Sequence, residues 1–290
     1  MISKKKIILV TGGAGFIGSN LIEQLVKDSA NQVYSLDNYS TGSKNNHIKG
    51  STYIEGDTRD IAKLVKIKPD LVFHLGEYAR VEKSFEDMEA VWRSNKDGTF
   101  AVLEFCRGNG TKLVYAGSST KFGDGGLGRD QSPYAWTKAS NTELVKNYGA
   151  WFRLKYAITY FYNVYGPREL GNKFGTVIEI FCQQRLKGEP LKVVSPGTQT
   201  RIFTHVDDIV RGLMLVGEKG IGDGYGLGAE EEYSILDIAK MFGGEIEMLP
   251  ERAGNRMTSS IDLSRSRDEL RWKAEKSIKK HIKAFVVTVE

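Results

Sequence analysis

Short apolar runs alternate with longer segments of helical spacing along the first half of the chain. The runs are rich in β-branched and aromatic residues and end in a polar residue or a glycine, as buried parallel strands do. The alternation predicts an α/β fold with a doubly wound parallel sheet and right-handed crossovers. The expected strands are residues 7–10, 32–37, 52–57, 71–76, 113–118 and 157–162, and the main expected helices are residues 16–26, 86–107 and 132–148.

A glycine-rich turn joins the first expected strand to the first expected helix. Gly12, Gly15 and Gly18 are spaced three residues apart in it. Gly12 allows a sharp turn, Gly15 allows a pyrophosphate to approach the backbone, and Gly18 allows close packing of helix and strand. The helix N-terminus offers free N–H groups to phosphate. The turn therefore predicts a dinucleotide site, although a tight structural turn would have a similar pattern.

Polar residues at the ends of the later strands extend this prediction. Asp37 follows the last glycine by about 20 residues, where a carboxylate binds ribose hydroxyls and repels a 2′-phosphate, so NAD is favoured over NADP. Asp57 is placed for the adenine edge or for a plain turn. His74 lies within an apolar run and is interpreted as a core histidine. Asn95 interrupts an apolar helix face and is expected to brace the sheet.

The C-terminal third has shorter segments and more glycine. We interpret Gly217, Gly220, Gly222, Gly224, Gly226 and Gly228 as loop turns. We expect a smaller mixed C-terminal substrate-binding lobe, packed over the carboxyl edge of the sheet with a cleft between them. The expected division assigns residues 1–165 with 199–218 to the dinucleotide-binding domain and residues 166–198 with 219–290 to the smaller lobe.

Composition narrows the class of protein further. The 290 residues are 40% hydrophobic and 27% charged, which allows a large buried core. The net charge of +5 is spread along the chain, so no nucleic-acid partner is expected. No apolar run is long enough for a membrane span, and no signal peptide is recognised, so a cytoplasmic location is expected. Cys106 and Cys182 lie in apolar contexts as buried thiols, and the histidines and cysteines have no metal-ligand spacing.

Tyr134 and Lys138 are the strongest candidates for catalysis. They lie four residues apart, so they share one face of a helix. An ammonium beside a phenol favours the tyrosinate, which allows Tyr134 to act as a general base. The helix follows a strand that ends in hydroxyl residues, and both are expected to meet over one nicotinamide. The candidate hydroxyl residues are Ser118, Ser119 and Thr120.

These motifs together resemble the extended short-chain dehydrogenases/reductases of the nucleotide-sugar epimerase/dehydratase family, over nearly the whole chain. The resemblance implies a Rossmann-type fold and a hydride that passes to tightly bound NAD and returns to a 4-keto sugar. The motifs are Thr11–Ser19, Asp37–Gly42, Gly56-Asp57, His74–Gly76, Tyr134 with Lys138, Asn163–Arg168, and the segment from Arg201 to Asp208.

The resemblance also implies roles for individual residues. Asn163, Arg201 and Arg252 resemble the residues that hold the nucleotide diphosphate, which guanidinium groups can bind in bidentate geometry. The further substrate candidates are Arg80, Ser118, Thr120, Tyr134, Thr176, Val193 and Ser259. The cofactor candidates are Gly12, Gly15, Phe16, Ile17, Asp37, Asn38, Ser40, Thr41, Gly42, Asp57, Thr58, Leu75, Gly76, Glu77, Asn95, Tyr134, Lys138, Phe161 and Val164.

Departures from the family pattern bear on the reaction. Lys121-Phe122-Gly123 follows Thr120, where the family's 4,6-dehydratases carry an Asp-Glu pair and its UDP-glucuronate decarboxylases carry a Glu. The reductases that make GDP-fucose use a Cys and a His and bind NADP, whereas Asp37 favours NAD. The simple 4-epimerase is therefore the leading interpretation. A dehydratase, a reductase and a non-catalytic NAD-binding regulator stay open as alternatives.

Two further expectations concern the sugar and the assembly. Ser259 stands where the family's 4-epimerases have a gatekeeper, and a small residue there resembles enzymes that admit N-acetylated sugars. We therefore expect UDP-GlcNAc/GalNAc as well as UDP-glucose/galactose. The family pairs through two helices per subunit, so a homodimer is expected through the helices at 86–107 and 133–148. Trp92 and Trp136 lie on them, although burial within one chain would also explain these aromatics.

Overall fold

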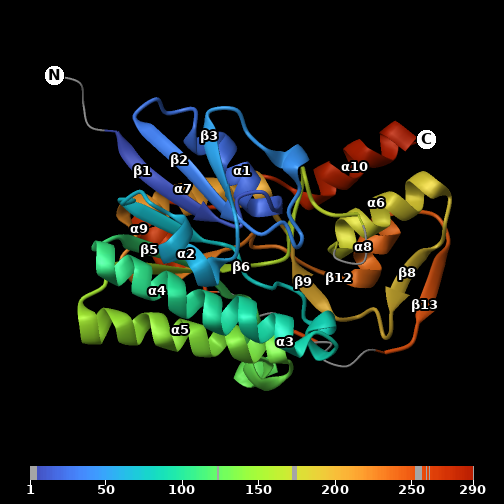
Figure 1. Ribbon diagram of the computed structural model, residues 1–290. Helices are drawn as coiled ribbons and strands as arrows, with labels where there is room; N and C mark the ends of the chain where they lie inside the picture. Colours follow the sequence, from blue (N-terminus) through green and yellow to red (C-terminus); the bar gives the residue numbers. More distant parts are fainter. Residues whose placement is uncertain are drawn as a thin grey trace.

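A computed structural model describes residues 5–289 apart from 123, 172–174, 252–256, 259 and 261. Its centre is a seven-stranded sheet in which every pair of neighbours is parallel (Figure 1). This is the Rossmann-type α/β fold that the sequence predicts. The strand order is β11-β6-β5-β4-β1-β2-β3, with β1 Lys6–Thr11, β2 Asn31–Asp37, β3 Ser51–Glu55, β4 Leu71–His74, β5 Lys112–Ser118, β6 Tyr156–Phe161 and β11 Gly222–Leu227.

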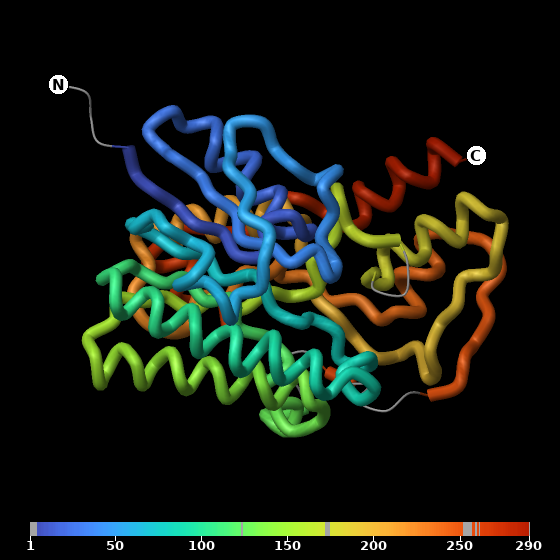
Figure 2. The backbone as a smooth tube through the Cα atoms, viewed as in Figure 1, coloured from blue at the N-terminus to red at the C-terminus, as the bar shows by residue number. Residues whose placement is uncertain are grey.

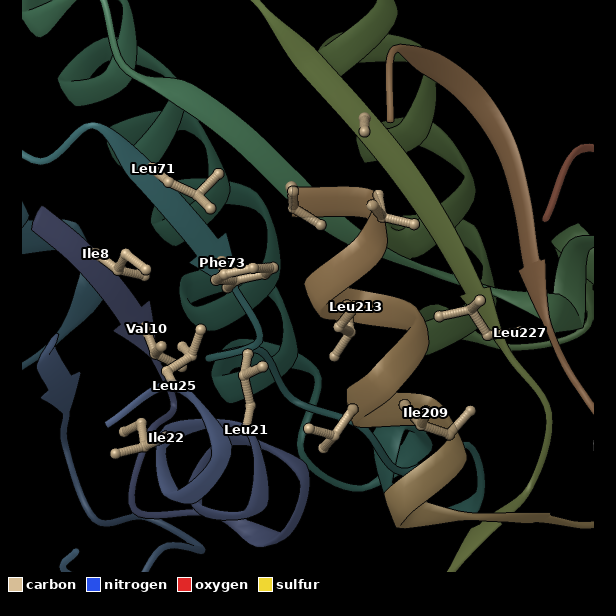
Figure 3. Close-up of a cluster of buried hydrophobic side chains, with 14 of the residues drawn as sticks. Ile8, Val10, Leu21, Ile22, Leu25, Leu71, Phe73, Ile209, Leu213 and Leu227 are labelled. Atoms are coloured by element: carbon tan, nitrogen blue, oxygen red, sulfur yellow. The ribbon is translucent and has the colours of Figure 1, made fainter. Parts of the chain in front are cut away.

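Helices cover both faces of this sheet. On one face α1 and α7 contact each other, and Leu21, Phe73 and Leu213 belong to the buried cluster between them and the strands (Figure 3). On the other face α2, α4 and α5 bury a second cluster that includes Leu103 and Val145. The chain therefore has two apolar layers around one sheet. The helices are α1 Phe16–Leu25, α2 Ile61–Leu64, α4 Gly98–Asn109, α5 Pro133–Phe152 and α7 Val206–Lys219.

The helix predicted at 86–107 is not continuous. A short turn at Glu82–Phe85 leads into α3 (Met88–Val91), which runs into a π-helical segment, η4 (Trp92–Asp97), before α4 begins. The wider π turn allows Asn95 to point inward, where it is fully buried. The periodicity of the apolar residues hides this irregularity, because both kinds of turn keep an apolar face.

The prediction that the glycines of the C-terminal third form only loop turns is wrong. Gly217 lies inside α7, and β11 is the seventh strand of the central sheet, parallel to β6. A Cβ on Gly226 would lie 2.1 Å from the carbonyl oxygen of Asp262, so glycine here permits close backbone approach. The sequence predicts that residues 219–290 belong to the smaller lobe, but β11 belongs to the central sheet. The rest of the division into two lobes stays a prediction.

The smaller lobe has its own core. A two-stranded parallel sheet, β8 with β13, packs with α6, α8 and α10 around Phe181 and Phe242. Figures 1 and 2 show these segments gathered at one end of the sheet, with α10 beside them. The elements are α6 Val177–Lys187, β8 Leu191–Val194, α8 Ile235–Phe242, β13 Ile246–Leu249 and α10 Ile278–Val289.

Short elements connect the two regions. A parallel pair joins β7 (Val164–Tyr165) to β10 (Thr204–His205), and an antiparallel pair joins β9 (Thr200–Ile202) to β12 (Glu232–Ser234). Among the residues described, no helix is both long and apolar enough to cross a membrane. The remaining elements are the turns η1 Lys44–Asn46, η2 Thr58–Asp60, η5 Ser119–Phe122 and η6 Asp124–Asp130, and α9 Ser264–Leu270, which contacts β11 and α7.

Candidate active site

A cavity of about 220 Å³ opens at the carboxyl ends of β1, β2, β4 and β5, beside the glycine-rich turn. The turn requires a φ of +72° at Gly12, a conformation that glycine adopts without strain. A Cβ on Gly18 would lie only 2.1 Å from the carbonyl oxygen of Gly12, so α1 approaches the turn as closely as the motif predicts. The predicted cofactor residues that line this cavity are Gly12, Gly15, Phe16, Ile17, Asp37, Asn38, Ser40, Thr41, Thr58, Leu75, Gly76, Glu77, Tyr134, Lys138 and Phe161.

Asp37 has the geometry expected of a ribose-binding carboxylate. It ends β2 and accepts hydrogen bonds from the backbone N–H of Ala14 at 2.9 Å and of Tyr39 at 2.8 Å. Burial raises the pKa of Asp37, and these two N–H groups oppose the rise. The two bonds fix the carboxylate at the edge of the cavity.

Four predicted cofactor residues do not line the cavity. Asp57 accepts from the backbone N–H of Arg59 at 2.9 Å, which is the turn role left open by the sequence. Val164 is buried in the sheet core, because β7 turns its side chain inward. Gly42 packs against Ala14 rather than facing the cavity. Asn95 is the fourth, and its role is to brace other segments.

Asn95 ties the loop after β4 to α5. Its Oδ1 accepts from the backbone N–H of Tyr78 at 2.7 Å, and its Nδ2 donates to Thr137 Oγ1 at 3.1 Å. Its backbone oxygen accepts from Nδ2 of Asn141 at 2.6 Å. The π-helical segment therefore braces the active-site end of the sheet, as the interrupted apolar face indicated.

His74 is a core histidine, as predicted. It is fully buried and lies 2.7 Å from Thr11 Oγ1 through Nδ1 and 3.0 Å from Thr99 Oγ1 through Nε2. Burial lowers its pKa to about 4, so the ring is neutral at physiological pH. A neutral ring with both nitrogens occupied is a structural group.

The predicted catalytic residues lie together at the end of β5 and the start of α5. Ser132 caps α5 by accepting from the N–H of Ala135 at 3.1 Å, which places Tyr134 in the first turn. Ser118 Oγ lies 2.9 Å from Thr120 Oγ1, and Ser119 is buried beside them. The ammonium of Lys138 is buried against Glu77 and the carbonyl oxygen of Ala116.

A second cavity, of about 490 Å³, lies between the sheet and the smaller lobe. Thr120, Asn163 and Arg201 line it, as predicted for substrate residues. It adjoins the first cavity, since Tyr134 lines one and Ala135 the other. Further polar residues line it that the sequence did not predict, because isolated amides and charges form no motif: Glu82, Gln131, Gln184, Lys192 and Gln199.

Some predicted substrate residues lie elsewhere. Val193 is fully buried, because β8 alternates and turns Lys192 and Val194 toward the cavity instead. Thr176 occupies the N-cap position of α6 without a capping hydrogen bond from its side chain, and it does not line the cavity. Arg80 lines the cofactor cavity. Arg252 and Ser259 lie outside the described residues.

Arg80 and Glu169 are two charged groups that are only partly exposed, and Arg80 lines the cofactor cavity. Arg80 Nη1 donates to the carbonyl of Ala79 at 2.9 Å, while its buried Nε has no partner among the described residues. Glu169 accepts from the N–H of Thr176 at 2.8 Å, and burial raises its pKa to about 7. No pattern in the sequence singles out Glu169, since an acidic loop residue is usually solvated.

The chain belongs to the NAD dependent epimerase/dehydratase family, whose model matches residues 8–228. Its cofactor is therefore NAD, and the family is enzymatic and acts on nucleotide sugars. The glycine cradle at Gly12 and Gly18 and the carboxylate of Asp37 fit this cofactor.

Relatives within the family differ in activity. UDP-glucuronic acid decarboxylase 6 of Arabidopsis thaliana is 30% identical over 91% of this chain and 83% of its own. The NAD complex of the UDP-glucose 4-epimerase of Thermus thermophilus superimposes with a TM-score of 0.87, at 28% identity and 98% coverage of both chains. The UDP-glucuronic acid 4-epimerase of Bacillus cereus, solved with UDP-glucuronic acid and NAD, gives a TM-score of 0.89 at the same identity and coverage.

Proposed function

We propose that this protein is an NAD-dependent nucleotide-sugar 4-epimerase acting on UDP-glucose/galactose and on UDP-GlcNAc/GalNAc. The observation that supports it most is the position of Tyr134, which lines the cofactor cavity where that cavity adjoins the larger one. A base at this border can reach a sugar hydroxyl while a cofactor occupies the other side. Thr120 lines the larger cavity, and its hydroxyl lies 2.9 Å from that of Ser118.

The residues after Thr120 argue against chemistry that needs a second acid. Lys121 occupies the position of the family's acidic residue, and its ammonium donates to Tyr160 OH at 2.6 Å, away from the cavity. Phe122 packs edge-on against the same tyrosine. Neither residue can protonate or deprotonate a sugar carbon, which favours simple epimerisation.

In the proposed reaction Tyr134 accepts the proton of the C4 hydroxyl, and Ser118 and Thr120 hold the oxygen by hydrogen bonds. NAD held in the cofactor cavity would supply a hydride acceptor at C4 and then a hydride donor, which would allow the hydride to return to the opposite face of the sugar. Asn163 and Arg201 hold the diphosphate, which keeps the nucleotide fixed while the sugar rotates. Asp37 binds the adenosine ribose and the glycine-rich turn binds the cofactor pyrophosphate.

A second candidate substrate is a nucleotide uronic acid. The observation that favours it is Arg80, whose buried Nε lacks a partner among the described residues and whose side chain lines the cavity with Tyr134. A sugar carboxylate would satisfy a guanidinium there. Two of the relatives described above act on UDP-glucuronic acid according to their names.

Turnover of three substrates tests the proposal. Purified protein is incubated with UDP-glucose, UDP-GlcNAc and UDP-glucuronic acid, and the products are followed by NMR. Inversion at C4 of the neutral sugars without net loss of NAD is expected. Loss of carbon dioxide from UDP-glucuronic acid would establish a decarboxylase instead, and loss of water a dehydratase. If the NAD-loaded protein turned over none of these sugars, the result would support the alternative that the protein is a non-catalytic NAD-binding regulator.

We also propose a homodimer through η4, α4 and α5. Trp92 and Trp136 stack with ring centroids 6.0 Å apart, yet they are 42% and 39% exposed. Phe100, Trp151 and Phe152 on the same helices are exposed as well. Aromatic side chains gathered on a solvent face are typical of an interface.

Light scattering after gel filtration tests the dimer. Trp92→Glu is expected to give monomer, because it places a charge in the centre of the aromatic face. Val287→Glu, at an exposed apolar position on α10, is the matched control and should leave the mass unchanged. A wild-type protein that elutes as monomer at all concentrations would contradict the proposal.

A further inference from the structure

Glu77 is a carboxylate buried beneath the candidate catalytic lysine. Its side chain is 3% exposed, and its Oε2 forms an ion pair with the ammonium of Lys138. Its Oε1 accepts three more hydrogen bonds, from Thr99 Oγ1 at 2.9 Å and from Tyr115 OH and Asn141 Nδ2 at 3.1 Å each. Side chains from α4, β5 and α5 therefore converge on one carboxylate.

This arrangement is more than generic core packing. A buried carboxylate without compensation would take up a proton, since desolvation disfavours its charge. Burial does oppose the ionisation of Glu77, but the charge of Lys138 and the hydrogen bonds hold its pKa below the ordinary value. Glu77 therefore carries its negative charge directly beside the Lys138 amine, where Lys138 borders the cofactor cavity.

We propose that Glu77 is a positioning residue for catalysis, which anchors Lys138 and, by balancing its charge, sets the pH range in which Tyr134 can exchange a proton. The inference rests on the proposed function, since it concerns the base of that same site. It goes beyond cofactor contact, because Glu77 acts through Lys138 rather than on the substrate.

The charges around Glu77 fix the sign of its effect. Removing a negative charge lowers the pH at which each neighbouring group loses its proton. His74 stays neutral throughout, because its pKa is already about 4. The titratable groups that face Glu77 are Lys138 from α5, Tyr115 from β5, His74 from β4 and Lys96 from η4, whose amine donates to Ser140 and Asn141. Tyr134 lines the same cavity as Glu77 and Lys138.

The first test is the pH profile of kcat/KM for Glu77→Gln, which keeps the shape of the side chain and removes its charge. Both limbs of the profile are expected to move to lower pH by about one unit. A residue that only packs would lower the rate and leave the limbs in place. That result would overturn the proposal.

Glu269→Gln is the matched control for this measurement. Glu269 also pairs with a cation, Arg265 at 2.6 Å, and also accepts from a tyrosine, Tyr225 OH at 2.7 Å. It lies on α9, outside both cavities. Its variant should leave the pH profile unchanged, and an equal shift in both variants would contradict a specific role for Glu77.

A second test does not depend on turnover. Thermal unfolding is measured for Glu77→Gln, Lys138→Met and the double variant. Each single variant leaves one buried charge unbalanced, so we expect Tm to fall by about 10 °C. The Tm of the double variant should fall by much less than the sum of the two single-variant losses. Additive losses would show that the two charges are not coupled and would overturn the proposal.

The outcomes separate this inference from the proposed function. If the wild-type protein turns over no nucleotide sugar, the proposed function fails, while the unfolding cycle still reports whether Glu77 and Lys138 are coupled. If Glu77→Gln does not fold, folding of the double variant supports the charge argument. Failure of both variants to fold overturns it, because Glu77 would then be needed for packing rather than for its charge.

Discussion

The two cavities that meet at Tyr134 are built in different ways. The cofactor cavity lies at the strand ends, and about half of the residues that line it are small, with Gly12, Gly15 and Gly76 among them. The substrate cavity is lined by side chains from both regions, among them long polar ones such as Gln184 and Arg201 and apolar ones such as Ile180 and Leu249. One site is a property of the sheet, whereas the other depends on how the smaller lobe meets it.

The two cavities should therefore respond differently to mutation. Backbone geometry at a strand end tolerates little change. Mutations in the cofactor cavity are therefore expected to lower both the stability of the fold and the affinity for NAD. Side chains in the lobe can change without disturbing the sheet, so the substrate cavity is expected to change affinity alone. Substitutions in each region test this separation, and the largest effect is expected at the border between them.

Tyr134→Phe changes a residue at the border between the two cavities, and it should weaken the binding of neither NAD nor the UDP-sugar. We expect turnover to fall by about 10²–10⁴-fold, because the base is lost while the ring still packs. Calorimetry should find NAD and UDP affinities unchanged, since the sheet and the lobe are untouched. A variant that loses NAD would show that the border cannot be separated from the cofactor cavity.

Glu169→Gln tests a carboxyl group outside both cavities through the pH dependence of protein stability. Burial raises the pKa of Glu169 to about 7, so the folded protein binds a proton that the unfolded chain releases near pH 4.5. The stability of the wild type therefore falls as the pH rises from about 4.5 to about 7, by up to about 3 kcal/mol.

The glutamine variant should lack this fall and be more stable than the wild type above pH 7. Urea unfolding across this range measures the difference. Glu189→Gln is the control, because it changes an exposed carboxylate after α6. It should not raise the stability above pH 7. Equal slopes in wild type and Glu169→Gln would rule out a proton bound at this site.

Gly18→Ala should damage the cofactor cavity and the fold together. The new Cβ would lie 2.1 Å from the carbonyl oxygen of Gly12. We therefore expect the free energy of unfolding to fall by about 1–3 kcal/mol and NAD to bind more weakly. Gly108→Ala in α4 meets no atom within 4 Å and should instead stabilise the protein by about 0.5–1 kcal/mol. Unfolding curves with and without NAD distinguish these outcomes.

Arg201→Met should have the smallest effect and confine it to the substrate cavity. We expect KM for the UDP-sugar to rise about tenfold, as for one charged hydrogen bond, with kcat and NAD affinity nearly unchanged. Arg267→Met, at an exposed position on α9, is the control. A large fall in kcat would mean that Arg201 also orients the sugar.

The sheet and the cofactor cavity could be predicted because the signals are local. An apolar run followed by a glycine or an acid defines both a strand and the chemistry at its end, as Val10 with Gly12 and Leu36 with Asp37 illustrate. Tyr134 and Lys138 were found in the same way, from their spacing on one helix. All of these positions depend on neighbours within a few residues.

Other features depend on contacts between distant segments and left no local signal. Val193 was expected at the substrate, but strand alternation, which is set by packing on the lobe, turns Lys192 to the cavity. Glu77 was expected only as a cofactor residue, because its partners Lys138 and Asn141 come from a helix about 60 residues away. The π turn at Asn95 is likewise explained by α5 rather than by its own sequence.

The position of β11 has a consequence for how the chain is made. Strand β6 forms an outer edge of the sheet until β11 pairs with it, and residues 162–221 separate the two. At about 5–20 residues per second, a chain emerging from the ribosome exposes this edge for several seconds. An open strand of sequence Tyr156–Phe161 is a template for pairing with another nascent chain. Premature termination between these two strands would therefore yield a fragment prone to aggregation rather than a smaller folded protein.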